Sequence, residues 1–156
     1  MTYEHIFFTV QDRVATITFN RPKALNALNR ALLAEFASAI DQVEDREDIH
    51  VLVLTGSGDK AFVVGADITE INQLDPLGAK HFARQGLDAI NRLPQLPIPV
   101  IAAVEGGAYG IGWSMVLACD MVVSADNARY CAPFLSLGLV PGGGWGWFLR
   151  RQLCAF

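Results

Sequence analysis

Apolar and polar residues alternate or recur along this chain with periods that predict a series of strands and helices. Partial alternation over residues 5–10 and 14–20 predicts two strands, joined across residues 11–13 into a half-covered hairpin. Nearly continuous apolar runs predict further strands, at residues 50–55, within 61–67, at 100–104 and at 121–125. A short segment near residues 129–132 follows them.

Amphipathic stretches between the strands predict helices. Asn29 is expected to cap the first helix, which ends near Asp45. Its apolar face recurs at intervals of three and four residues, at Leu32, Phe36, Ile40 and Val43. A second helix over residues 77–93 has an inward face formed by Phe82, Leu87 and Ile90. Shorter helices are expected from residue 67, over residues 113–119, and from 145 to 156.

The order of these elements places the chain in the α/β class. A hairpin, a helix and then a strand imply a right-handed crossover. No repeat, linker or low-complexity tract is present, so we expect residues 1–156 to form a single core domain.

A glycine-rich turn at residues 105–112 joins the apolar strand at 100–104 to the helix that follows. It holds four glycines, Gly106, Gly107, Gly110 and Gly112. Glycine lets the backbone approach a ligand, and a helix start leaves N–H groups unpaired, so such a turn can hold an anion or a developing oxyanion. The dinucleotide and phosphate-loop patterns both fail here. Ser114 lies in a near match to the nucleophile elbow, which lacks only the last glycine.

Composition narrows the partners that we expect. The chain is 52% hydrophobic and 18% charged, which provides a core and an excess of apolar surface for partner subunits to cover. A net charge of −4 argues against nucleic acid, and no apolar run is long enough for a membrane span. The cysteines and histidines have no metal-ligand spacing, so we expect no metal, reduced and mostly packed thiols, and a cytoplasmic protein.

Four motifs in this chain resemble the crotonase family, also called the enoyl-CoA hydratase/isomerase family. They are RPKALNAL at 21–28, AFVVGADITEI at 61–71, VEGGAYGIGW with the following ACD within 104–120, and SLGLVPGGG at 136–144. The resemblance implies an α/β crotonase-like core, the spiral of stacked ββα turns shared with ClpP. It also implies an acyl-CoA thioester as substrate, no separate cofactor, and a homo-oligomer, either a trimer or a hexamer.

The resemblance also implies the site residues. The backbone N–H groups of Ala66 and Ile111 would hold the thioester oxygen. The residues expected to bind substrate are Lys23, Ala24, Leu25, Gly65, Ala66, Asp67, Ile68, Thr69, Gly110, Ile111 and Trp113. Of these, Lys23 to Leu25 and Gly65 to Thr69 would lie along the CoA nucleotide.

The catalytic positions depart from the family. A hydratase of this family adds water across a double bond with two glutamates, one positioning the water and one delivering a proton. By motif position these glutamates are replaced here by Ser114 and Phe134, which cannot exchange protons at neutral pH. We therefore expect hydratase activity to be weak or lost.

Other substitutions point in the same direction, because most add apolar bulk around the expected pocket. They are Val63, Val64, Ile111, Trp113, Trp145, Gly146 and Trp147. Three interpretations stay open: an acyl-CoA enzyme with different chemistry assisted by Ser114 or Glu105, a non-catalytic module for assembly or CoA binding, and a scaffold with a rebuilt apolar pocket. Such rebuilding could come from divergence or from engineering.

Each candidate side chain also has a structural interpretation. Glu105 fits a surface acid at a strand end, Asp67 a helix cap, and Asp120 an acceptor for backbone donors of the next turn. The tryptophans fit a core as well as a ligand platform. The family continues past residue 156 into a helical region that covers the site and builds trimers. The chain is therefore either a fragment or a protein without that lid, and exposed apolar surface is expected.

Overall fold

A computed structural model describes residues 2–153 and contains two sheets. The larger sheet has five strands, in the order β1 (Ile6–Gln11), β2 (Val14–Phe19), β3 (Val51–Gly56), β5 (Val100–Val104) and β7 (Met121–Ser124). Only β1 and β2 pair antiparallel, as the predicted hairpin requires, and every later pair is parallel. The smaller sheet is parallel throughout, in the order β4 (Ala61–Val63), β6 (Gly107–Tyr109) and β8 (Arg129–Cys131).

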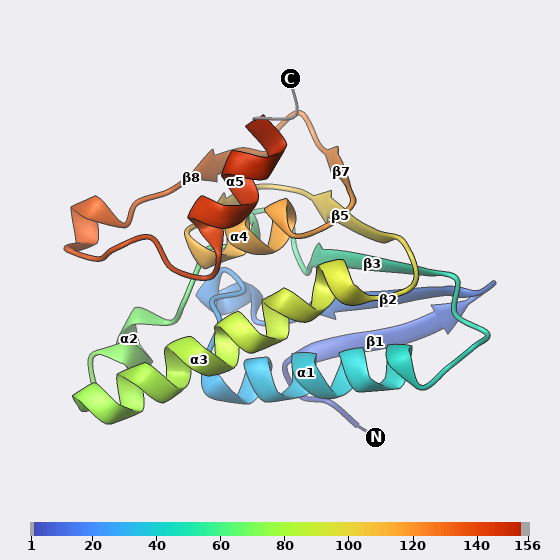
Figure 1. Cartoon of the computed structure of the whole chain (residues 1–156), viewed down its shortest axis with the longest axis horizontal. Helices are drawn as coiled ribbons and strands as arrows, with labels where there is room; N and C mark the ends of the chain where they lie inside the picture. The colour runs from blue at the N-terminus through green and yellow to red at the C-terminus, as the bar shows by residue number, and fades with distance from the viewer. Residues whose placement is uncertain (1, 154–156) are drawn as a thin grey trace.

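The helices follow the strands in a repeating order. They are η1 (Pro22–Ala24), α1 (Arg30–Glu44), α2 (Ile68–Ile71), α3 (Pro76–Arg92), η2 (Leu93–Gln95), α4 (Ile111–Leu117), η3 (Leu135–Leu137) and α5 (Trp145–Leu153). From β3 onward the chain adds one strand to the larger sheet, one to the smaller sheet, and then helix (Figure 1). Three such turns follow each other, which confirms the predicted α/β core of stacked ββα units.

The core lies between the larger sheet and α1, which runs beside α3 (Figure 1). The predicted inner face of α1 is buried, and Asn29 caps the helix by accepting a hydrogen bond from the Leu32 N–H at 2.8 Å. The rings of Phe36 and Phe62 meet the ring of Phe19 edge-on, with centroids at 5.3 and 5.7 Å. The alternation read from β2 therefore corresponds to one face packed on helix and core.

Several boundaries differ from the predictions. A three-residue strand, β6, forms inside the glycine-rich turn, because Gly107 to Tyr109 pair with both β4 and β8. As a result α4 begins at Ile111, two residues earlier than predicted. On α3 the buried small residues are Gly86 and Ala89, whereas Leu87 is half-buried. The predicted end of the last helix, residues 154–156, lies outside the described residues.

The two cysteines in the described part of the chain differ in burial. Cys119 is buried, and burial, with the nearby Asp120 charge, raises the pKa of its thiol to about 12, so it stays protonated. Cys131, in contrast, is exposed, against the expectation that the thiols are mostly packed, because every residue of β8 is exposed.

No helix within residues 2–153 has both the length and the hydropathy to cross a membrane.

One glycine decides how closely the fold can bring α4 to β4. Gly112 is the second residue of α4, and a Cβ there would lie 2.0 Å from the carbonyl oxygen of Val63. No side chain fits that space, so the helix start can rest on the strand end only with glycine at this position. The contact ties α4 to the smaller sheet.

Replacing Gly112 with alanine tests this packing. Alanine normally favours a helix over glycine by about 1 kcal/mol, but here the overlap with Val63 should destabilise the protein by about 1–3 kcal/mol. Gly146 provides the matched control, because it is the second residue of α5 and a Cβ there meets nothing within 4 Å. Urea unfolding should show Gly146→Ala as neutral or stabilising. Equal midpoints for the two variants would contradict the packing argument.

Candidate functional site

Two glycine-flanked helix starts come together at the ends of β4 and β6. The strands are parallel neighbours with Val63 paired to Ala108, and Ala66 and Ile111 each come three residues after that pair. Gly65, at φ +109°, keeps this approach close, since a Cβ on it would lie 3.3 Å from the Tyr109 carbonyl oxygen. Ala66 and Ile111, the two backbone positions named from the sequence, therefore follow two neighbouring strands of the smaller sheet.

The N–H groups of Ala66 and Ile111 are both without a protein acceptor in the described part of the chain. Leu28 bonds on either side of Ala66: its N–H donates to the Gly65 carbonyl, and its carbonyl accepts from the Asp67 N–H, both at 2.8 Å. Neither of these two hydrogen bonds uses the N–H of Ala66 itself. Ile111 is the first residue of α4, where an N–H has no acceptor within the helix. Two free donors are what an oxyanion requires.

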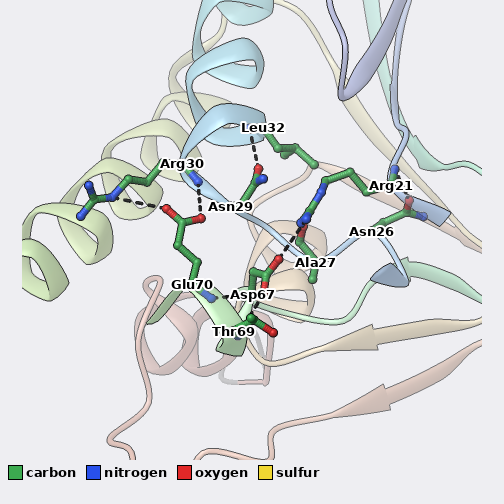
Figure 2. Close-up of polar contacts among 9 residues, drawn as sticks. All are labelled: Arg21, Asn26, Ala27, Asn29, Arg30, Leu32, Asp67, Thr69 and Glu70. Carbon is green, nitrogen blue, oxygen red and sulfur yellow. Dashed lines mark hydrogen bonds and ion pairs between the residues drawn. The ribbon is translucent and has the colours of Figure 1, made fainter. Parts of the chain in front are cut away.

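An ion pair fixes the backbone next to Ala66. Arg21 contacts Asp67 at 3.0 Å and donates to the Ala27 carbonyl at 2.5 Å (Figure 2). The other Asp67 oxygen caps α2 by accepting from the N–H groups of Thr69 and Glu70. Burial alone raises the pKa of Asp67, but the Arg21 hydrogen bond and charge and these N–H groups outweigh it, so the pKa is lowered. Asp67 therefore acts as a charged helix cap, as predicted.

A second acid holds α2 from the opposite side. Glu70 accepts a hydrogen bond from the Arg30 N–H at 3.0 Å, and its carboxylate lies 3.5 Å from the Arg30 guanidinium (Figure 2). Arg30 is the first residue of α1, so the short helix after Ala66 is tied to both the 21–28 loop and α1. A four-residue helix would otherwise have little to hold it.

The loop at residues 21–28 is anchored by the buried amide of Asn26. This side chain is 0% exposed; its oxygen accepts from the Arg21 N–H, and its nitrogen donates to the carbonyls of Ala61 and Ser57. Leu25 and Asn26 both have positive φ, a conformation that non-glycine residues adopt only when their surroundings hold them. The hydrogen bonds of the Asn26 amide hold both residues in this conformation, and the loop in turn places Leu28 beside Ala66.

Of the three residues expected at the CoA nucleotide in this loop, two line a cavity. Lys23 and Leu25 border a space of about 320 Å³ closed on its other side by Ser57 to Ala61, whereas Ala24 does not line it. Lys60 thus faces the same cavity as Lys23. The sequence prediction missed the 57–61 stretch, although its Gly-Ser-Gly turn followed by Lys60 was a readable signal. Ile68 and Thr69 are exposed on α2, outside this cavity.

The two glutamate positions are covered in this structure. Ser114 is 0% exposed, and its hydroxyl lies 3.4 Å from each of the carbonyls of Gly110 and Gly142, so it has no base as a partner. A Cβ on Gly143 would lie 2.7 Å from the Ile111 side chain and 3.3 Å from the Ser114 hydroxyl. The segment at 142–144 therefore sits directly on Ile111 and Ser114.

Phe134 belongs to a row of aromatic rings beside the same segment. The order is Tyr130, Trp113, Trp145 and Phe134, with successive centroids at 5.9, 5.6 and 6.1 Å. Trp147 is not part of it: the residue is 64% exposed, and the Arg151 guanidinium lies 4.6 Å from the centroid of its ring. The expectation that Trp147 adds bulk to the pocket is wrong, because successive residues of a helix point in different directions.

The remaining candidates are structural. Glu105 is exposed just after β5. Asp120 accepts a hydrogen bond from the Val100 N–H at 2.8 Å, so its backbone donor lies in the preceding strand β5 and not in the next turn. No group of three or more His, Cys, Asp or Glu side chains within residues 2–153 is arranged to hold a metal ion.

Comparison with known proteins gives one consistent result. Residues 9–155 match the family described as enoyl-CoA hydratase/isomerase. The crotonyl-CoA hydratase of Syntrophomonas wolfei is 40% identical over 144 residues, which are 92% of this chain and 55% of that protein. The 1,2-epoxyphenylacetyl-CoA isomerase of Escherichia coli is 37% identical over 153 residues, 95% of this chain and 58% of that protein.

Solved structures agree with these relatives. The enoyl-CoA hydratase of Bacillus anthracis superposes with a TM-score of 0.90 at 32% identity, over 95% of this chain and 58% of that one. A hydratase from Polaromonas superposes with a TM-score of 0.88 at 33% identity, over 94% of this chain and 58% of that one. The chain thus spans a little more than half the length of the relatives that it matches.

Arg21→Ala tests the ion pair beside Ala66. The two side chains are 19% and 17% exposed, so their separation should cost about 1–2 kcal/mol at pH 7, between the values for surface and buried pairs. Because the folded pKa of Asp67 is lowered, this stabilisation is complete above the unfolded pKa of about 4 and is lost as pH falls through the folded pKa. The difference between the urea midpoints of parent and variant should therefore shrink as the pH is lowered toward 3, leaving the part that comes from the hydrogen bond of Arg21 to the Ala27 carbonyl.

Arg84→Ala serves as the control for this measurement. Arg84 pairs with Asp88 on the exposed face of α3, with both side chains more than half exposed. Its loss should change stability by no more than about 0.5 kcal/mol at either pH. A difference between the parent and Arg21→Ala that is the same at pH 7 and pH 3 would show that the Asp67 charge is not involved.

Proposed function

This chain belongs to the enoyl-CoA hydratase/isomerase family, the crotonases, and from that we infer that it binds acyl-CoA thioesters. The observation that carries the proposal is the pair of unpaired N–H groups at Ala66 and Ile111, at the ends of adjacent strands. In the proposed complex both donate to the thioester oxygen, where negative charge grows when the acyl group reacts. The CoA thioester is then the substrate itself, with no separate cofactor.

The nucleotide part of CoA is proposed to occupy the cavity between Lys23 and Lys60. Both side chains border its volume of about 320 Å³, and ammonium groups are suited to phosphate oxygens. The cavity abuts the Asn26 amide, which in turn fixes the loop that ends at Leu28 and Ala66. Nucleotide binding and thioester binding would thus use one rigid stretch of backbone.

The chemistry that follows binding is proposed to be weak. Hydration requires one group to take a proton and another to give one, and the chain has a buried hydroxyl at Ser114 and a phenyl ring at Phe134 in those places. The Ser114 hydroxyl is held between two carbonyls, which leaves it without a base. The two N–H groups would still polarise the thioester, but no carboxylates would be present to transfer the protons that hydration requires.

A second candidate, a non-catalytic scaffold or a pocket for a small apolar ligand, has one observation in its favour. The 142–144 segment and the aromatic row occupy the space around Ile111 and Phe134. Assembly is proposed alongside either function, in the form of a homo-oligomer. It is supported by exposed apolar side chains on the later part of the chain, above all Leu135 at 87% and Val140 at 84%.

Calorimetric titration with butyryl-CoA and with free CoA tests binding. We expect saturable binding of both, tighter for the thioester because only it offers the oxygen for Ala66 and Ile111. The double variant Lys23→Ala with Lys60→Ala should bind both ligands more weakly by a similar factor, whereas Lys80→Ala, at an exposed position of α3, should change neither affinity. Absence of heat with either ligand would overturn the proposal and favour the apolar scaffold.

Restoring the carboxylates tests the proposed loss of chemistry. Ser114→Glu combined with Phe134→Glu should hydrate crotonyl-CoA about 10²-fold or more faster than the parent, the range attributed to general acid and base catalysis. Ser114→Gln with Phe134→Gln is the control, because it moves the 142–144 segment by the same volume without a titratable group. Equal rates in the two double variants, each shown by its urea midpoint to be folded, would contradict the proposal.

A further inference from the structure

Another cavity lies at the end of α4 opposite to Ile111. It has a volume of about 440 Å³, against about 320 Å³ for the cavity beside Lys23 and Lys60. One wall is the stretch 117–120, where α4 ends and β7 begins, and the other is a face of α5, which packs on α4 (Figure 1). None of the residues that border it belongs to the proposed acyl-CoA site, so the two sites are separate.

Two opposite charges border this cavity, and neither has a charged partner among residues 2–153. The Arg151 guanidinium lies 4.6 Å from the centroid of the Trp147 ring but forms no ion pair with a carboxylate in that part of the chain. Asp120 accepts a hydrogen bond from the Val100 N–H at 2.8 Å through one carboxylate oxygen. Its other oxygen has no donor among the same residues. Both charges are therefore available to a ligand.

The same face of α5 offers an aromatic surface. Trp147 is 64% exposed, and the buried Phe148 lies next to it in the cavity wall. Trp147 and Arg151 are four residues apart, so they share one face of the helix, and the guanidinium lies over the indole. This contact holds the ring and the cation together. An aromatic ligand can pack on the exposed part of the indole, either edge-on or offset.

The two charges limit the class of ligand. A simple anion would be attracted by Arg151 but repelled by Asp120, and a simple cation would meet the reverse. A compound with both a carboxylate and an ammonium group can satisfy both charges, since a guanidinium binds a carboxylate through two parallel hydrogen bonds. Pockets for small ligands have volumes of about 300–1,000 Å³, so the cavity has room for such a compound with a ring.

We propose that this cavity binds a free aromatic α-amino acid. The carboxylate of the ligand contacts the Arg151 guanidinium, its ammonium group contacts the Asp120 carboxylate, and its ring packs against Trp147. The site uses neither the backbone donors of the proposed thioester site nor the cavity beside the two lysines. It is therefore a binding function in addition to the one proposed above.

Calorimetric titration of the parent with three related compounds tests the two charge contacts. The probe is L-phenylalanine; 3-phenylpropionate has the same ring and carboxylate but no ammonium group, and phenethylamine has the ammonium group but no carboxylate. L-phenylalanine should bind saturably, and each analogue should bind roughly three- to tenfold more weakly, between the values for an exposed ion pair and for a hydrogen bond to a charged group. Equal affinities for the three compounds, or no binding of L-phenylalanine up to its solubility limit, would overturn the proposal.

Two variants assign the contacts to residues. Arg151→Gln should weaken the binding of L-phenylalanine by the same factor without weakening that of phenethylamine, which has no carboxylate. Asp120→Asn keeps an oxygen for the Val100 N–H and should weaken the binding of L-phenylalanine but not that of 3-phenylpropionate. Arg150→Gln is the matched control, because Arg150 is exposed on the same helix and does not border the cavity.

The control separates a site from a general attraction between charges. An equal loss of affinity in Arg150→Gln and Arg151→Gln would overturn the proposed site. Urea midpoints check that each variant is folded, and if one is not, the comparison of the three compounds on the parent still decides. Failure of this proposal would leave the acyl-CoA proposal standing, because the two sites share no residue and butyryl-CoA is titrated separately.

Discussion

The buried amide of Asn26 is the contact on which the proposed site depends. It joins the loop at 21–28 to a stretch more than thirty residues later in the sequence, namely the turn after β3 and the first residue of β4. Gly56 makes room for it, since a Cβ there would lie 2.8 Å from the amide nitrogen. Loss of this amide would leave buried carbonyls unpaired and release two residues held at positive φ. The position of Leu28, and through it that of Ala66, follows from this contact.

The smaller sheet connects the part of the chain held by Asn26 to the second proposed donor, the N–H of Ile111. The β4–β6 pairing sets the distance between the two helix starts, and the close contact of Gly112 with Val63 fixes the direction of α4. The N–H of Ile111 is therefore positioned by backbone packing, with no side chain of its own involved. Substitutions such as isoleucine at 111 are compatible with this arrangement, because a donor made of backbone does not require a particular side chain.

The sequence alone predicted the elements with strong local signals. The hairpin, α1 with its Asn29 cap, and the Asp67 cap each follow from periodicity or from a side chain bonding within three residues. The three-residue strand β6 was missed, because glycine has no preference for strands and its pairing partners lie more than twenty residues away. The cover of Ser114 by 142–144 was missed because it depends on a tertiary contact that no local pattern encodes. The cavity wall at 57–61 did carry a local signal, the Gly-Ser-Gly turn before Lys60, but only the tertiary structure shows that it faces Lys23.

Most of the positions that the sequence analysis named as departures from the family lie in the later turns of the fold, whereas Val63 and Val64 lie in β4 and directly after it. The part of the chain up to α2 provides the 21–28 loop, the cavity bordered by Lys23 and Lys60, and the Ala66 N–H. The later turns provide Ile111, Ser114, Phe134 and Trp145, which surround the place where the proposed function puts the acyl group. In the proposed function, binding of the CoA part and of the acyl part therefore depends mainly on different turns, which are joined by the pairing of β4 with β6 and of β3 with β5. The side chains around the proposed acyl group can then change without moving the two thioester donors, because those donors are backbone groups held by strand pairing.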